Sequence, residues 1–170
     1  MAIIMPDDGE HLATIEAFAA ADEAAGAVLT LPYDSRKRSR QRVALDDGRR
    51  AALLLPRGTV LRNGDRLKLG AAEVVLVKAA PESVSTVTAA DPVQLARVAY
   101  HLGNRHVPLQ VGPGWLRYQH DHVLDAMVQG LGAGVTAELA PFEPEGGAHS
   151  GAAEDSDHSH SHHHHGHGHG

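Results

Sequence analysis

The chain contains no cysteine, only 4% aromatic residues and no long apolar run. Without thiols it forms no disulfide, iron–sulfur cluster or thiolate zinc site. The longest apolar runs, such as residues 51–55, are far too short to span a bilayer, and the first residues lack the basic and apolar regions of a signal peptide. The net charge of −6 argues against general nucleic-acid binding. We therefore expect a cytoplasmic protein with neither membrane nor nucleic acid among its partners.

Histidine, in contrast, is abundant. The 170 residues include 14 histidines, of which nine follow residue 148 and eight lie at positions 158–169. Such a tract is typical of metal binding, and imidazole accepts nickel, zinc, copper and iron. Because imidazoles bind metal only when deprotonated, the metal affinity of the chain should depend strongly on pH.

Charge divides the chain into three parts. Residues 1–78 hold 12 basic and 11 acidic residues, residues 79–147 hold 3 and 7, and residues 148–170 hold no Lys or Arg. We interpret these parts as a β-rich N-terminal domain, a second folded domain and a His-rich tail. The tail lacks branched aliphatic and aromatic residues, so burial cannot offset the entropy of ordering it, and we expect it to be disordered.

The first domain is predicted to be mostly β. Asp46-Asp47-Gly48 is a turn signal, and Asn63-Gly64-Asp65 indicates a tight hairpin turn. The Ala-rich residues 10–25 are compatible with a helix, although such stretches also occur in loose N-terminal segments. β-branched or alternating apolar residues predict strands at residues 27–32, 41–45, 51–55 and 73–78.

The second domain is predicted to follow the order β-α-β-β-α-β, which is the ferredoxin-like pattern within an overall α+β fold. Strands are expected at residues 83–88, 107–111, 116–118 and 135–139. Asp91-Pro92 supplies an N-cap and a first helical proline for one helix, which Gly103-Asn104 can end. Asp121 caps the second helix, and Gly132 or Gly134 ends it.

The tail offers many ligands on a flexible backbone. Gly and Ser between the histidines impose little conformational resistance, so many ligand sets can close around an ion, with poor selection among metals. A purification tag is the alternative, but irregular spacing and interspersed acidic residues favour a native metal-binding tail. Its candidate ligands are His149, His158, His160, His162, His163, His164, His165, His167 and His169.

His106 lies in the segment Gly103-Asn104-Arg105-His106, where the predicted helix ends and a strand begins. A lone histidine in such a place is often structural or merely exposed. One imidazole cannot hold a divalent transition metal, which takes about four to six donors. A two-fold dimer places the same residue of both chains near one axis, so a pair of His106 side chains could supply two imidazoles from a preformed surface.

The third candidate is His120-Asp121-His122 at the start of the second predicted helix. Two imidazoles and one carboxylate lie within a single turn, and the positive end of the helix dipole disfavours protonated imidazole there. The alternative is that Asp121 is only an N-cap and that the histidines are exposed neighbours.

A basic row, Arg36, Arg38, Arg40 and Arg42, points to one face if the segment is a strand. Such a row keeps an edge strand from pairing with another molecule, which we favour. Docking to an acidic protein is the alternative. Nucleic acid ranks third, because no aromatic residues interleave with the charges.

Several segments resemble the UreE-type urease accessory proteins, a family of nickel metallochaperones. The similarity spans residues 27–147 and extends to the kind of tail, whereas residues 1–26 do not match. The segments that carry it are 34–40 (DSRKRSR), 53–58 (LLLPRG), 100–110 (YHLGNRHVPLQ), 116–118 (LRY), 120–125 (HDHVLD) and 141–145 (PFEPE).

The resemblance implies a homodimer whose N-terminal domain is peptide-binding-like and contacts partners, and whose ferredoxin-like second domain binds metal. His106 falls on the family's main ligand at the dimer axis, and His120 and His122 fall on additional metal positions. A histidine near the start of the tail often completes the axial site, and His149 is the candidate here. The implied partners are apo-urease and its accessory GTPase, and metal bridging of dimers into a tetramer stays open.

The sequence therefore predicts a nickel carrier for urease maturation and not an enzyme, since it contains no GxSxG, phosphate-loop or HExxH motif. One rival is a His-rich nickel or zinc buffer without a delivery role, and another is a peptide-binding chaperone with an incidental tail. Imidazole ligands do not by themselves select Ni²⁺ over Zn²⁺ or Cu²⁺.

Overall fold

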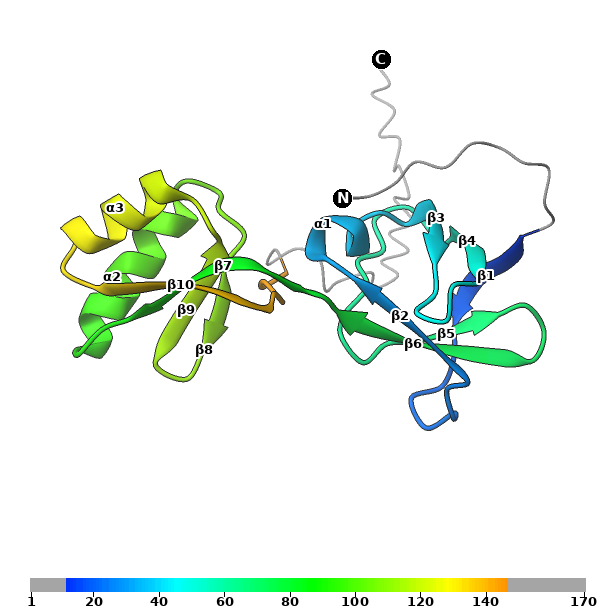
Figure 1. The fold of residues 1–170 in the computed structure, drawn as a ribbon. Helices are drawn as coiled ribbons and strands as arrows, with labels where there is room; N and C mark the ends of the chain where they lie inside the picture. Colours follow the sequence, from blue (N-terminus) through cyan, green and yellow to red (C-terminus); the bar gives the residue numbers. More distant parts are fainter. Residues whose placement is uncertain (1–11, 147–170) are drawn as a thin grey trace, which may run out of the picture.

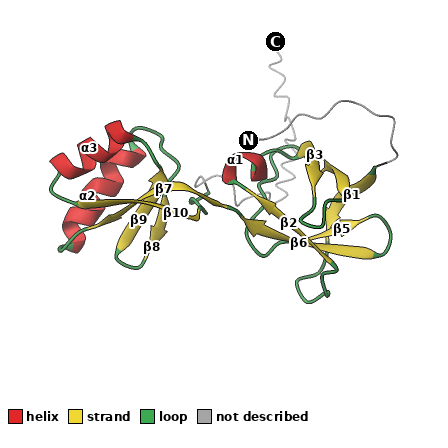
Figure 2. Ribbon diagram, in the orientation of Figure 1, coloured by secondary structure: helices red, strands yellow, loops and turns green. Residues whose placement is uncertain are grey.

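The computed structural model describes residues 12–146, which form an α+β structure with two separate sheets (Figure 1). The first sheet has six strands, and the second has four strands with two helices on one face (Figure 2). The chain passes from the first sheet to the second at Ala80, between two consecutive strands. Within residues 12–146, no helix is long and apolar enough to cross a membrane.

The first sheet has the strand order β2-β6-β5-β1-β4-β3. Two neighbouring pairs, β1 with β4 and β2 with β6, are parallel, and the others are antiparallel. The four strands predicted for this part are confirmed to within one residue at each end. The bounds are β1 Ala13–Phe18, β2 Ala27–Leu31, β3 Arg40–Ala44, β4 Arg50–Leu54, β5 Arg66–Leu69 and β6 Glu73–Ala79.

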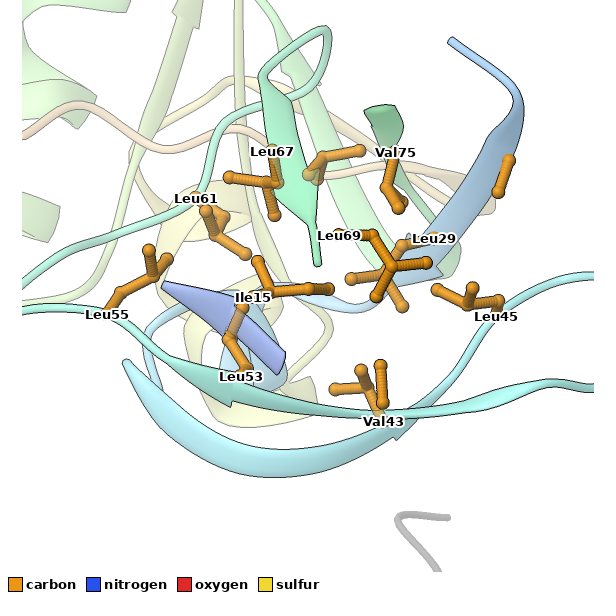
Figure 3. Packing of buried hydrophobic residues seen from close by; sticks show 13 residues of the cluster. Ile15, Leu29, Val43, Leu45, Leu53, Leu55, Leu61, Leu67, Leu69 and Val75 are labelled. Carbon is orange, nitrogen blue, oxygen red and sulfur yellow. The ribbon is translucent and has the colours of Figure 1, made fainter. Parts of the chain in front are cut away.

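The core of this sheet is aliphatic (Figure 3). Ile15, Leu29, Leu53, Leu67 and Val75 are all fully buried and come from five different strands. The sheet also nearly closes on itself, because residues just after β3 reach β2 at the opposite edge. The amide of Asp46 donates to the carbonyl of Val28 at 2.9 Å, and its carboxylate accepts from the Thr30 hydroxyl at 2.6 Å.

Two predictions for this domain are wrong. The stretch compatible with a helix, residues 10–25, instead contains strand β1, because Ile15 is buried between β4 and β5 and pairing on both sides outweighs the helix propensity of alanine. Asn63-Gly64 does form a turn, with Gly64 at φ +92°. It is not a hairpin turn, however, since β4 and β5 are not neighbours and β1 lies between them.

The second sheet has the order β10-β7-β9-β8, and all neighbouring strands are antiparallel. Its elements follow one another as β-α-β-β-α-β, as predicted, although β8 is shorter than residues 107–111. The helices cover the face on which Val87, Leu116 and Tyr118 lie, and they add Val98, Leu102 and Val128 to the core. The bounds are β7 Pro81–Thr88, α2 Pro92–Gly103, β8 Gln110–Gly112, β9 Trp115–Gln119, α3 His122–Gly130 and β10 Gly134–Pro141.

Arg36 joins the two halves of the molecule. It ends the short helix α1 (Tyr33–Arg36), and its side chain is completely buried. Its guanidinium donates to three carbonyls and one carboxylate, those of Leu31, Leu61, Phe142 and Glu143. The predicted row of four arginines on one face of a strand is therefore wrong. Only Arg40 and Arg42 lie on β3, which is indeed an edge strand.

The segment that Arg36 holds, residues 141–145, is here called the strap. It begins at the last residue of β10 and runs between the two sheets, in orange at the centre of Figure 1. Phe142 is fully buried with its ring edge-on to Tyr33, at 5.4 Å between centroids. Arg62 donates to the carbonyl of Pro144 at 2.6 Å. The strap thus packs the end of the second half against the first half.

Candidate functional site

His106 has an unusual backbone conformation at the end of α2. Its φ of +56° is the only positive φ of a non-glycine residue within residues 12–146. The amide of His106 donates to the carbonyl of Gly103 at 2.9 Å, and the amide of Val107 donates to that of Leu102 at 3.3 Å. These two bonds are the Schellman motif, which requires a left-handed residue at the position of His106. The predicted helix stop at Gly103-Asn104 is confirmed, and the motif that follows it places His106 in the left-handed position.

Helix α3 ends in the same motif with a different residue. There the amide of Gly132 donates to the carbonyl of Gln129 at 2.9 Å, and that of Ala133 donates to Val128 at 3.3 Å. Gly132 has a φ of +84° and occupies the left-handed position, as is usual for glycine. The same domain therefore contains one helix end with the favoured glycine and one with an exposed histidine in its place.

His120 belongs to a network that the sequence did not reveal. Its Nδ1 atom lies 3.0 Å from the hydroxyl of Ser85 and 3.2 Å from a carboxylate oxygen of Asp125. The other carboxylate oxygen accepts from the hydroxyl of Tyr118 at 2.6 Å. Burial, then the bond to Asp125, raises the pKa of Tyr118 far above its usual range, while a hydrogen bond from Ser85 acts in the opposite direction. Tyr118 is thus a permanent donor at neutral pH.

Strand geometry explains this network. Tyr118 and His120 are two residues apart, so they point to the same face of the sheet, and Ser85 is the cross-strand partner of Tyr118. That face is the one that α3 covers, and Asp125 lies in the first turn of α3. The set of Ser85, His120 and Asp125 is not a nucleophilic triad, because serine and aspartate contact the same ring nitrogen and the serine is completely buried.

Asp121 acts as the N-cap of α3, which was the simpler of its two interpretations. Its carboxylate accepts from the amides of Val123 and Leu124 at 2.7 and 3.2 Å. These backbone bonds hold the pKa of Asp121 below its usual value. Its neighbour His122 is the first residue of the helix and is exposed.

Within residues 12–146, no group of three or more His, Asp or Glu side chains is arranged to hold a metal ion. His106, His120 and His122 therefore do not combine into one site within a single protomer. The remaining predicted ligands lie outside the described residues: His149, His158, His160, His162, His163, His164, His165, His167 and His169.

The end of the strap lies beside the loop that carries His106. The amide of Glu145 donates to the carbonyl of Leu109 at 2.8 Å, and that of Glu143 donates to the side chain of Gln110 at 3.0 Å. Leu109 is only three residues from His106 in sequence. The chain therefore leaves the described region beside this loop.

Sequence patterns did not single out Asp125, Tyr118 or Ser85, and they placed Arg36 only as one member of a basic row. Alternation along β9 could have indicated that Tyr118 and His120 share a face. No local signal, in contrast, links Ser85 to them, because their contact depends on the pairing of β7 with β9. Likewise, no local signal separates the buried Arg36 from its exposed neighbours.

Comparison with known proteins gives consistent results for both halves of the chain. A family described as UreE urease accessory protein, N-terminal domain, matches residues 10–80, and its C-terminal domain matches residues 82–170. The chain is 64% identical over 125 residues to the urease accessory protein UreE of Pseudomonas putida (strain W619), covering 73% of this chain and 78% of that protein. It is 57% identical over 124 residues to the protein of the same name from Proteus mirabilis (strain HI4320), covering 73% and 77%.

Proposed function

The chain belongs to the UreE family of urease accessory proteins, and we propose that it carries Ni²⁺ to apo-urease during maturation of the enzyme. Its membership makes it an accessory protein in urease maturation and not an enzyme. We further propose that it acts in the cytoplasm as a homodimer, together with the accessory GTPase of the urease system. Nickel is cargo in this proposal and not a resident cofactor.

The observation that carries the proposal is the backbone of His106. A left-handed conformation costs a non-glycine residue about 1–2 kcal/mol, and such strain is often retained at functional sites. Gly132 avoids this cost at the equivalent position of α3, so nothing in the motif itself requires a histidine. An exposed imidazole at this position is well suited to meet its copy across a two-fold axis and to share an ion with it.

The strap supports a role for the tail in the same site. From Glu145, a chain of four residues reaches at most about 14 Å, at about 3.6 Å per residue. His149 is therefore within range of the His106 loop, and we propose it as the residue that completes the axial site. His158, His160, His162–His165, His167 and His169 would form a reservoir, and His120 and His122 additional positions. A site built only from imidazoles exchanges its ion more readily than a cage of thiolates.

We assign residues 1–78 and 79–147 to two domains and residues 148–170 to the tail. The change of sheet at Ala80 and the two separate cores support this division. The strand order β10-β7-β9-β8, with both helices on one face, supports a ferredoxin-like class for the second domain.

Nickel titration with native mass determination tests the proposal, because it gives stoichiometry and oligomeric state together. A chain that ends at Gly147 lacks His149 and should remain dimeric and bind about one Ni²⁺ per dimer, more weakly than the full chain does. His106→Gly in that chain should abolish binding of this ion. The main alternative is a metal buffer, which the clustering of eight histidines at positions 158–169 favours. Loss of all nickel binding on truncation would favour the buffer and contradict delivery through the axial site. No effect of truncation on urease activation at limiting nickel would contradict the reservoir role of the tail.

A further inference from the structure

We propose that Asp125 positions His120 as a metal ligand by keeping the imidazole proton on Nδ1, so that the lone pair of Nε2 is available to the ion. This inference rests on the proposed function in one respect, namely that His120 binds metal. The observations behind it are the contacts of Nδ1, the anchoring of the carboxylate and the exposure of the ring.

The contacts of Nδ1 determine which nitrogen is protonated. Nδ1 of His120 lies 3.2 Å from Oδ2 of Asp125, and a carboxylate only accepts hydrogen bonds. An unprotonated Nδ1 would place its lone pair against those of the carboxylate. The hydroxyl of Ser85, 3.0 Å from Nδ1, can accept from the same N–H. The neutral ring is therefore held as the Nδ1–H tautomer, in which Nε2 is the free donor to a metal.

The carboxylate of Asp125 is itself held in place. Tyr118, which is fully buried, donates its hydroxyl to Oδ1 at 2.6 Å. The Asp121 cap stabilises the first turn of α3, on which Asp125 lies. Only 16% of the Asp125 side chain is exposed, compared with 39% for His120. The network is thus buried at the carboxylate end, while part of the imidazole reaches solvent.

This arrangement is the one that metal-binding histidines usually have. Their second ring nitrogen donates to a carboxylate or carbonyl, which fixes the tautomer and ring orientation, and loss of that partner typically weakens metal affinity 10–100-fold. Asp125 is therefore assigned as a positioning residue and not as a ligand.

Asp125→Asn is the decisive substitution, because it changes hydrogen-bonding character at nearly constant shape. Because the hydroxyl of Tyr118 still donates, the oxygen of the new side-chain amide should remain its acceptor. The NH₂ group of that amide then faces Nδ1 of His120. Nδ1 must accept from this group, which moves the ring proton to Nε2 and blocks the ligand atom. Long-range ¹H–¹⁵N NMR of the metal-free, full-length protein reports directly which ring nitrogen is protonated, and His120→Gln identifies the resonances.

Zn²⁺ serves as a diamagnetic probe of affinity in the same spectra, because the Nε2 resonance of His120 can be followed despite competition from other histidines. In the wild type we expect a protonated Nδ1 and a Zn²⁺-dependent change at Nε2. In Asp125→Asn we expect a protonated Nε2 and 10–100-fold weaker binding at this residue. Asp22→Asn, in the turn that follows β1 of the first sheet, is the matched control and should change neither the tautomer of His120 nor its Zn²⁺ binding.

The outcomes separate this inference from the proposed function. A wild-type ring protonated on Nε2, or unchanged Zn²⁺ binding at His120 in Asp125→Asn, overturns the role of Asp125 and leaves His120 as a ligand. A wild-type ring with the expected tautomer but no response to Zn²⁺ overturns the assignment of His120 as a ligand, and this inference with it. If Asp125→Asn fails to fold, Tyr118→Phe gives a second test, since the released carboxylate should also weaken Zn²⁺ binding at His120.

Discussion

Replacing His106 with glycine should remove the proposed axial metal site without destabilising the protein. The left-handed conformation costs a side-chain-bearing residue about 1–2 kcal/mol, toward the lower end for His, which adopts it more readily than most residues. Glycine avoids this cost but loses about 0.5–1 kcal/mol through the greater freedom of the unfolded chain. We expect His106→Gly to be between about 0 and 1 kcal/mol more stable than the wild type.

A series at this position separates ligand chemistry from backbone strain. His106→Ala should be slightly less stable than the wild type, and His106→Val should be about 1–2 kcal/mol less stable than His106→Gly, because β-branched residues are the least tolerant of positive φ. All three variants should lose the axial Ni²⁺ equally. Gly132→Ala is the reciprocal control. It should lower the free energy of unfolding by about 1–2 kcal/mol, since φ is +84° and the new Cβ would approach the side-chain nitrogen of Gln94 to 2.7 Å.

Thermal unfolding with chelator measures stability, and equilibrium dialysis measures bound nickel. For a chain of this size 1 kcal/mol corresponds to about 2–4 °C in Tm, and protomer concentration must be held constant because the proposed dimerisation contributes to stability. A loss of more than about 1 kcal/mol in His106→Gly would show that the imidazole is part of the fold. Retention of the axial ion would show that His106 is not its ligand.

Three further predictions concern the fold around the site. Arg36→Met should destabilise the protein by about 3–5 kcal/mol in denaturant unfolding, because it removes the buried guanidinium that pairs with Glu143 and donates to three carbonyls. Arg36→Lys should restore only part of this loss, since an ammonium cannot reach all four acceptors. Gly112→Ala should shift the fluorescence of Trp115, the only tryptophan, and cost about 1–3 kcal/mol, because a Cβ there would overlap the indole ring. Asp121→Ala should lower Tm by a few degrees at neutral pH, because it removes the cap of α3. The pKa of Asp121 is depressed in the folded state, so the cap stabilises the protein above the ordinary pKa of aspartate and this contribution is lost as pH falls through the folded-state pKa. The Tm difference between wild type and variant should therefore shrink below about pH 4.

Local chemistry was sufficient to predict most of the second domain. Asp91 and Asp121 cap their helices through side-chain bonds to nearby amides, and these signals depend only on residues within one turn. The strands of the first domain were also found from β-branched and alternating residues. Pairing between distant strands was not predictable in this way, which is why the Asn63-Gly64 turn was misread as a hairpin and β1 as helical.

Arg36 and His106 illustrate two different limits of sequence patterns. Arg36 and four other basic residues lie between positions 36 and 42, yet Arg36 alone is buried, because the strap returns more than 100 residues later to supply acceptors. His106 was singled out at a predicted helix end and then matched to a family ligand, but neither step gave a reason for a histidine at a helix end. The dihedral angle provides that reason independently. Since α3 ends in the same motif with Gly132, a histidine at the left-handed position of α2 is less favourable for folding than a glycine would be. A residue that folding disfavours and that lies exposed is better explained by what binds to it than by what it packs against.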